Sequence, residues 1–143
     1  MKYLYLITPG ILLFAANMVM AKETGINVRP LLSTEKTITG QTIEVPQNPQ
    51  VIAAVYEIAP GASLPIHEHP YPRYAYIIEG TLRVNVIDTN ETFDSKPGDF
   101  IVEMRGQKHF GMNTGTVPAR LLVIDQVPHG TKSNVIVHED KQQ

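Results

Sequence analysis

Three histidines are the residues of this 143-residue chain whose type and spacing could do chemistry. His67 and His69 stand two residues apart in an apolar and aromatic stretch, and His109 lies in a second such stretch. On a β-strand, residues i and i+2 point to the same face, so His67 and His69 would share one face. Neutral imidazoles bind divalent metal ions, but buried histidines also serve as hydrogen-bonded core residues. The pair is therefore half of a metal site or half of a polar pocket, and it needs partners from elsewhere in the chain.

The stretch of residues 61–80 must position the histidine pair. Pro70 and Pro72 cannot donate to a strand ladder, so they predict a turn between the strand of the histidine pair and a strand over residues 74–78. We expect these two strands to form an antiparallel hairpin. The partner histidine, His109, falls on a predicted strand over residues 107–113.

Short apolar or alternating segments, separated by Gly and Pro turns, predict the other elements. No sustained 3.6-residue apolar stripe occurs outside the N-terminus, and the 11 prolines and 10 glycines favour turns and short strands over long helices. We therefore predict an all-β barrel or sandwich. Its strands are expected over residues 37–39, 41–45, 51–58, 81–88, 100–104, 107–113 and 119–127.

The N-terminus has the pattern of a secretory signal peptide. Lys2 supplies a positive start, residues 4–19 are mostly apolar, and Val19 and Ala21 fit positions −3 and −1 of a cleavage site after Ala21. Pro9 helps to interrupt the apolar run, which falls short of the ~20 apolar residues that a membrane span needs. We expect an exported chain, periplasmic or extracellular, with no stable membrane anchor after cleavage. It contains no cysteine, so its fold does not depend on disulfides.

The length provides for one folded domain, which we divide into four parts. The formal net charge of −2 gives no basic surface, so we expect no nucleic-acid partner. The predicted parts are a signal peptide (1–21), an N-terminal extension with short strands (22–50), a β-barrel (51–127) and a polar C-terminal segment (128–143).

Two spaced motifs within residues 61–113 resemble those of the cupin family. The first comprises Gly61, His67, His69, position 73 and Gly80, and the second comprises Gly98, position 104, Gly106, His109 and Asn113. The resemblance implies a double-stranded β-helix, or jelly roll, with a divalent metal ion inside the barrel. It implies His67, His69 and His109 as metal ligands. Three neutral imidazoles suit zinc, copper, iron or nickel, and manganese is a further candidate.

Arg73 departs from the first motif, because the family has its ligand glutamate at that position. Arginine stays protonated and has no acceptor atom, so it cannot bind a metal ion. A guanidinium ~5 Å from a divalent ion would be repelled by roughly 6–7 kcal/mol at an effective dielectric of about 20. We therefore expect either that Arg73 turns to the rim or pairs with an acid such as Glu103, or that no metal binds.

Two classes of function follow from this combination. The first is a metal-dependent oxygenase or a related small-molecule enzyme, in which three histidines hold the ion. The second is a non-catalytic module that binds a small anionic or sugar-like ligand beside a degenerate metal site. Substrate-binding candidates are Arg73, Tyr74, Glu103 and Asn113, and no catalytic residue is assigned. Small cupins commonly pair through sheet edges, so the resemblance also makes a homodimer a candidate assembly.

Overall fold

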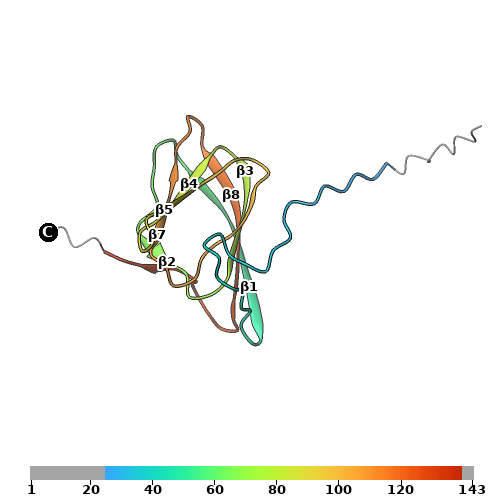
Figure 1. Ribbon diagram of the computed structural model, residues 1–143, viewed down its shortest axis with the longest axis vertical. Coiled ribbons are helices and arrows are strands. Elements are labelled where there is room, and N and C mark those ends of the chain that lie inside the picture. Colours follow the sequence, from blue (N-terminus) through green and yellow to red (C-terminus); the bar gives the residue numbers. More distant parts are fainter. Residues whose placement is uncertain (1–24, 140–143) are drawn as a thin grey trace, which may run out of the picture.

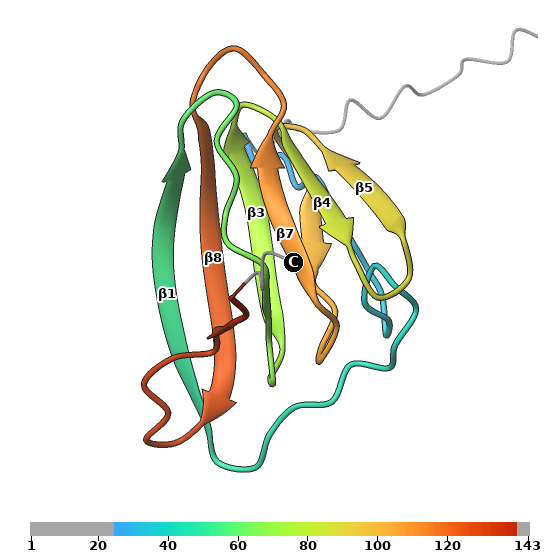
Figure 2. The same cartoon turned by 90° about the vertical axis from the view of Figure 1, so that its left-hand side faces the viewer.

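The computed structural model describes residues 25–139, and every strand in that range belongs to one of two antiparallel sheets. The sheets face each other across a common interior (Figures 1 and 2). The four-stranded sheet has the order β1 (Pro49–Ile58), β8 (Ala119–Pro128), β3 (Arg73–Glu79) and β6 (Phe100–Val102). The five-stranded sheet has the order β5 (Glu91–Ser95), β4 (Leu82–Val86), β7 (His109–Asn113), β2 (His67–Glu68) and β9 (Ile136–Val137).

This arrangement confirms the all-β prediction and has the two-sheet form of a jelly roll. The signal-peptide prediction concerns residues 1–21, which lie outside the described residues. No helix occurs among residues 25–139, so this part of the chain offers no helical membrane span.

The inner face of β3 changes from polar to apolar along the strand. On β3, Arg73, Ala75 and Ile77 all point inward and are buried, because alternate residues of a strand share a face. On β7, His109 begins the inward row in the same way. Ala75 and Ile77 pack in the apolar core with residues of β4 and β8, whereas Arg73 and His109 lie in a second, polar interior region.

The predicted hairpin around Pro70 and Pro72 is wrong. β2 pairs with β7 and β9, whereas β3 pairs with β6 and β8, so the two strands belong to different sheets. β2 contains only two residues, and the proline-containing turn then carries the chain across the interior to the opposite sheet. Prolines were correctly taken as ending a ladder, but the next strand joins another sheet.

The two strands predicted over residues 37–45 are also absent. The chain there makes a tight turn at Gly40, whose φ is +84°, and a single bridge joins Lys36 to Thr42. The extension packs beside β6 through a hydrogen bond from the Ile38 N–H to the Val102 carbonyl, at 2.9 Å. Conversely, β5 and β9 were missed, because β5 is a largely polar strand at a sheet edge and β9 has two residues.

Gly80, the last glycine of the first motif, has a steric reason for its type. Its φ is +71°, and a Cβ atom added there would lie 2.6 Å from the carbonyl oxygen of Pro118. Only glycine accommodates both this conformation and the close approach of the backbone at Pro118, just before β8.

Candidate metal centre

His67, His69 and His109 converge in the polar part of the interior, and we call them the histidine cluster. His67 on β2 lies directly opposite His109 on β7, and His69 follows β2. Their ring centroids are 4.4 to 4.8 Å apart, and all three side chains are buried. One nitrogen from each ring lies within 4.8 Å of the others. The convergence of the three imidazoles that the resemblance implied is confirmed, and His109 lies on the strand that pairs with the His67 strand.

Backbone carbonyls fix the tautomer of each imidazole in the cluster. A carbonyl oxygen can only accept a hydrogen bond, so the Nδ1 atom that faces it must carry the hydrogen. In the neutral ring Nε2 then keeps a lone pair, and the Nε2 atoms of His69 and His109 face each other at 3.2 Å. The acceptors are the carbonyl of Pro65 for His67 at 2.7 Å, of Gln107 for His109 at 2.8 Å and of Asn134 for His69 at 2.9 Å.

Facing lone pairs repel unless a proton or a cation lies between them, so this cluster fits a metal ion. Ligand atoms bound about 2.1 Å from one ion lie about 3.0 Å apart at right angles and about 3.4 Å apart at tetrahedral angles. The 3.2 Å between His69 and His109 falls within that range. Burial also lowers the pKa of His67 to about 4, with smaller contributions from the other two histidines, so that ring is neutral at pH 7.

Glu103 reaches the cluster from the opposite sheet. Its carboxylate Oε2 lies 2.9 Å from His69 Nε2 and 3.5 Å from His109 Nε2. Burial alone would raise the pKa of Glu103, but its contacts with His109 and His69 and the charge of Arg73 outweigh burial. The pKa therefore lies well below its usual range, and Glu103 is an anion.

Arg73 is buried beside the cluster and is paired with Asp125. Arg73 on β3 and Asp125 on β8 are directly opposite, and Nε and Nη2 donate to the two carboxylate oxygens at 2.7 and 2.8 Å. Burial would lower the pKa of Arg73, but these hydrogen bonds and the nearby carboxylates raise it. The expected pairing with an acid is present, but the partner is Asp125 instead of Glu103. The alternative position at the rim is wrong, since only 3% of Arg73 is exposed.

Glu103, Arg73 and Asp125 form what we call the charged row. The Glu103 N–H donates to the Arg73 carbonyl at 2.9 Å and thereby continues the β3–β6 pairing by one residue. The row thus runs across β6, β3 and β8 with alternating negative, positive and negative charges. Asp125 was not selected from the sequence, although an acid in the inward series Leu121, Val123, Asp125 is a signal that strand alternation could have revealed.

Asn134 was also missed, because it lies in the C-terminal segment, to which no role was assigned. It is fully buried, and its Nδ2 donates to Asp125 Oδ1 at 2.7 Å and to the Tyr71 carbonyl at 3.0 Å. Its own carbonyl accepts from His69. Asn134 therefore joins the histidine cluster to the charged row, and β9 beyond it pairs with β2.

Tyr74 and Asn113 are not brought to the cluster. Tyr74 points to the outer face of β3, where its hydroxyl donates to Gln126 Oε1 at 3.1 Å and its ring lies near Phe100. Asn113 caps a turn at the other end of β7, with Nδ2 donating to the carbonyls of Ile58 and Val117. Neither residue lines the cavity beside the cluster.

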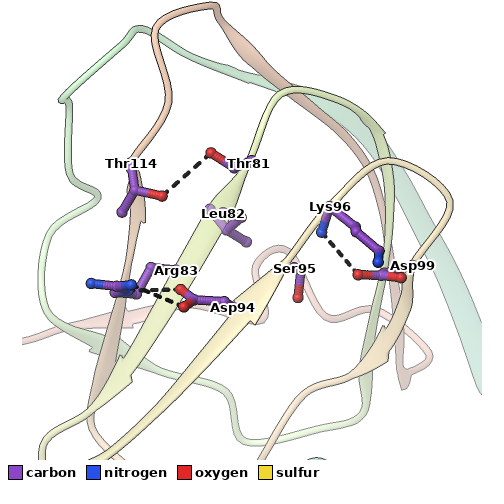
Figure 3. A pocket seen from close by; sticks show the side chains of 8 residues that line it. All are labelled: Thr81, Leu82, Arg83, Asp94, Ser95, Lys96, Asp99 and Thr114. Carbon is purple, nitrogen blue, oxygen red and sulfur yellow. Dashed lines mark hydrogen bonds and ion pairs between the residues drawn. The ribbon is translucent and has the colours of Figure 1, made fainter.

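The cavity beside the cluster is small, with a volume of about 30 Å³, and is lined by residues that include His67, His109, Glu103 and Arg73. Spaces of about 80 and 180 Å³ adjoin Tyr56 and Arg73. A larger depression of about 460 Å³ is lined by residues of the paired strands β4 and β5 and by Lys96, Asp99 and Thr114 (Figure 3). It is lined by the exposed Arg83–Asp94 ion pair and contains no residue of the histidine cluster or of the charged row.

The chain belongs to the cupin family. The family model described as "Cupin domain" matches residues 54–125, just over half of the sequence. The matched segment contains the histidine cluster and the charged row. The family membership implied by the two motifs is thus confirmed, and with it the double-stranded β-helix fold.

Proteins similar to this chain include a germin-like protein, a polyketide cyclase and an oxalate decarboxylase. Germin-like protein subfamily T member 2 of Arabidopsis thaliana is 43% identical over 70 residues, which are 46% of this chain and 32% of that protein. The polyketide cyclase RemF of Streptomyces resistomycificus is 27% identical with a TM-score of 0.51, covering 63% of each chain. Bacillus subtilis oxalate decarboxylase, described with Mn(II) centres, is 26% identical with a TM-score of 0.53, covering 61% of this chain and 23% of that one. The chain spans about a third of the germin-like relative.

Proposed function

We propose that this protein is an exported cupin that binds a divalent metal ion through His67, His69 and His109. The observation that carries the proposal is the set of three Nδ1 hydrogen bonds to backbone carbonyls, which directs three Nε2 lone pairs into one buried space. Imidazole ligands suit zinc, iron, copper and nickel, and manganese is the metal named for the similar oxalate decarboxylase. A bound ion would supply Lewis-acid or redox chemistry to a small molecule beside it.

The charges around the cluster favour a small anionic ligand. Arg73 and Asp125 neutralise each other, so anionic Glu103 leaves the interior with one net negative charge. A divalent cation would reverse that sign and attract an anion, such as a carboxylate or an enolate. The 30 Å³ cavity beside the cluster admits only a small group. The body of the ligand would occupy the spaces beside Tyr56 and Arg73.

The proposed activity is that of a metal-dependent oxygenase or a related small-molecule enzyme. Two similar solved structures carry the names of enzymes, a polyketide cyclase and an oxalate decarboxylase. In this chain the histidine cluster would hold the ion, and Arg73 would line the ligand's approach. Export rests on the signal-peptide pattern of residues 1–21, and mass spectrometry of the mature N-terminus tests it through the expected start at Lys22.

A non-catalytic binding module is the second candidate. The observation in its favour is Arg73, which replaces the motif's ligand glutamate and is itself paired with Asp125. Such a module would bind a small anion in the barrel without turning it over.

Metal analysis and an oxygen-uptake screen separate these candidates. Purified protein from medium with equal zinc, manganese, iron, copper and nickel should contain about one ion per chain, and a variant with all three histidines replaced by alanine should contain none. Oxygen consumption or product formation with small carboxylic acids, lost in that variant, would support the enzyme. Stoichiometric metal and anion binding without turnover would support the module. Wild-type protein that contains no metal and does not bind added divalent ions would refute both metal-based proposals.

A further inference from the structure

Glu103 lies where a carboxylate could replace the ligand that position 73 no longer supplies. Glu103 and Arg73 are cross-strand neighbours, joined by the 2.9 Å hydrogen bond between the Glu103 N–H and the Arg73 carbonyl. Neighbouring strands present such residues on the same face of a sheet. A carboxylate on this neighbouring strand can therefore enter the interior region that a glutamate at position 73 would enter. We propose that Glu103 is the fourth protein ligand of the metal ion, an inference that rests on the metal binding proposed above.

The contacts of the Glu103 carboxylate fit those of a metal ligand as well as those of a hydrogen-bond partner. His69 donates from Nδ1 to the Asn134 carbonyl, and His109 donates from Nδ1 to the Gln107 carbonyl. In the neutral rings the Nε2 atoms therefore have no hydrogen to offer Glu103, although its Oε2 lies 2.9 and 3.5 Å from them. These distances lie just outside the two ends of the range expected between ligand atoms on one ion, about 3.0 to 3.4 Å, so a small shift of the carboxylate would bring both into it. A shared cation explains why acceptor atoms point at one another here.

The charged row explains how Arg73 is tolerated beside this site. Asp125 takes both Nε and Nη2 of the guanidinium, and Asn134 donates a further hydrogen bond to the same carboxylate. The positive charge is thereby neutralised by a fixed anion on the side of β8, while the carboxylate on the side of β6 stays available to the cluster. Glu103, on the strand next to Arg73, would therefore supply the carboxylate ligand that position 73 lacks. Asp125 compensates for the positive charge of Arg73.

Metal titration of Glu103→Gln tests the assignment. The substitution keeps the shape of the side chain and removes its charge, so affinity for Mn²⁺ and Zn²⁺ should fall at least tenfold. Mn²⁺ should lose more, because carboxylates suit it better than imidazoles do. Glu68→Gln is the matched control: Glu68 lies between His67 and His69 in sequence, yet its carboxylate faces His138 at 3.6 Å. Its affinity should stay within twofold of the wild type.

The outcomes of this titration separate the inference from the proposed function. If wild-type protein binds neither ion, or if His69→Ala binds as tightly as wild type, metal binding by the cluster is refuted. If binding depends on His69 but Glu103→Gln binds like the wild type, only the role of Glu103 is refuted. Should Glu103→Gln fail to fold, Glu103→Asp takes its place. That variant keeps the charge but shortens the reach, so it should bind several-fold more weakly, and an unchanged affinity would overturn the inference.

Discussion

The two sheets that enclose the site supply it with different chemistry. The five-stranded sheet supplies the three imidazoles of the histidine cluster, from β7, from β2 and from the residue after β2. The four-stranded sheet supplies the charged row, with Arg73 on β3, Asp125 on β8 and Glu103 after β6. One wall is neutral and offers lone pairs, and the other wall carries a net negative charge.

The two walls also differ in how their side chains are held. His67 and His109 each donate to a carbonyl two residues earlier in the chain, so their orientation is set locally. Arg73 is held by Asp125, which is 52 residues away in sequence. The hydrogen bonds of His67 and His109 form wherever their own strand segments are folded, whereas the charged row forms only when three strands are aligned. We therefore expect substitutions of Arg73 and Asp125 to affect folding first, and those in the cluster to affect metal binding first.

The largest effect should follow from breaking the charged row with Asp125→Ala. This change leaves the buried guanidinium of Arg73 without its bidentate partner, and loss of one member of a buried ion pair costs about 3–5 kcal/mol. Urea unfolding in the presence of a chelator measures the loss without any contribution from metal. Replacing both members by apolar residues, Arg73→Met with Asp125→Leu, should recover much of it.

Asp94→Ala is the matched control for that experiment. Asp94 also accepts a bidentate pair from an arginine, Arg83, at 2.7 and 2.9 Å, but both side chains are exposed (Figure 3). Water solvates the arginine that remains, so the unfolding midpoint should barely move. Equal effects of Asp94→Ala and Asp125→Ala would contradict the burial of the charged row.

A second effect, of about 3 kcal/mol, should appear in the pH dependence of the metal-free protein. Burial lowers the pKa of His67 from 6.5 to about 4, so between these values the unfolded chain binds a proton that the folded chain does not. The contribution of His67 to the free energy of unfolding should therefore be fully present above pH 6.5 and be lost as the pH decreases to 4. Glu103, with its lowered pKa, adds a further loss that begins only below its ordinary value of 4.5.

His67→Gln isolates the contribution of His67 to that profile. Glutamine does not titrate, so urea unfolding of this variant from pH 7 to pH 4, with chelator, should show a shallower decline than the wild type. Parallel profiles would mean that protonation of His67 is not linked to folding.

A third effect should follow from removing one imidazole with His109→Ala. A ligand that binds only the folded chain stabilises it by about 2.7 kcal/mol at one hundred times its dissociation constant. Added Zn²⁺ should raise the melting temperature of the wild type by several degrees and leave His109→Ala unchanged. His129→Ala is the control, because His129 is exposed at the end of β8 and should keep the full metal response. A wild type indifferent to added ions and to chelator would remove the basis for this effect.

The sequence predicted the histidine cluster better than the charged row. The physical reason is that the charged row depends on pairing between strands that are far apart in sequence. Two-residue spacing placed His67 and His69 on one side, which follows from local strand periodicity. The resemblance to the second cupin motif placed His109 with them. The sheet to which a strand belongs depends on partners far away in sequence, so the expected hairpin across Pro70 and Pro72 was wrong even though the strand over residues 73–79 was largely foreseen.

The same limit explains what was missed in the site. From the sequence alone, the Glu103 side chain could enter the pocket or pair with Arg73, because both lie within reach of a strand end. Asp125 gave no site signal because it lies in a strand over residues 119–127 that is otherwise largely apolar. The sequence indicates only a polar C-terminal segment. In the structure this segment brings Asn134 into contact with both walls, through hydrogen bonds with His69 and Asp125.

The smallest of the four effects should follow from Asn134→Ala, which tests whether this segment couples the two walls. The variant keeps the carbonyl that accepts from His69 but loses the side-chain hydrogen bonds to Asp125 and to the backbone of Tyr71. Loss of buried hydrogen bonds costs about 1–3 kcal/mol, to be measured by urea unfolding with chelator.

Ser133→Ala is the matched control, since the Ser133 hydroxyl makes only an exposed local hydrogen bond to the Val135 N–H. Its unfolding free energy should stay close to that of the wild type. If Asn134 couples the walls, its removal should destabilise less in an Asp125→Ala background than in the wild type, because one of its partners is already gone. Additive losses in the double variant would show that Asn134 supports the two walls independently, and the C-terminal segment would then be a cover for the barrel instead of a link within its site.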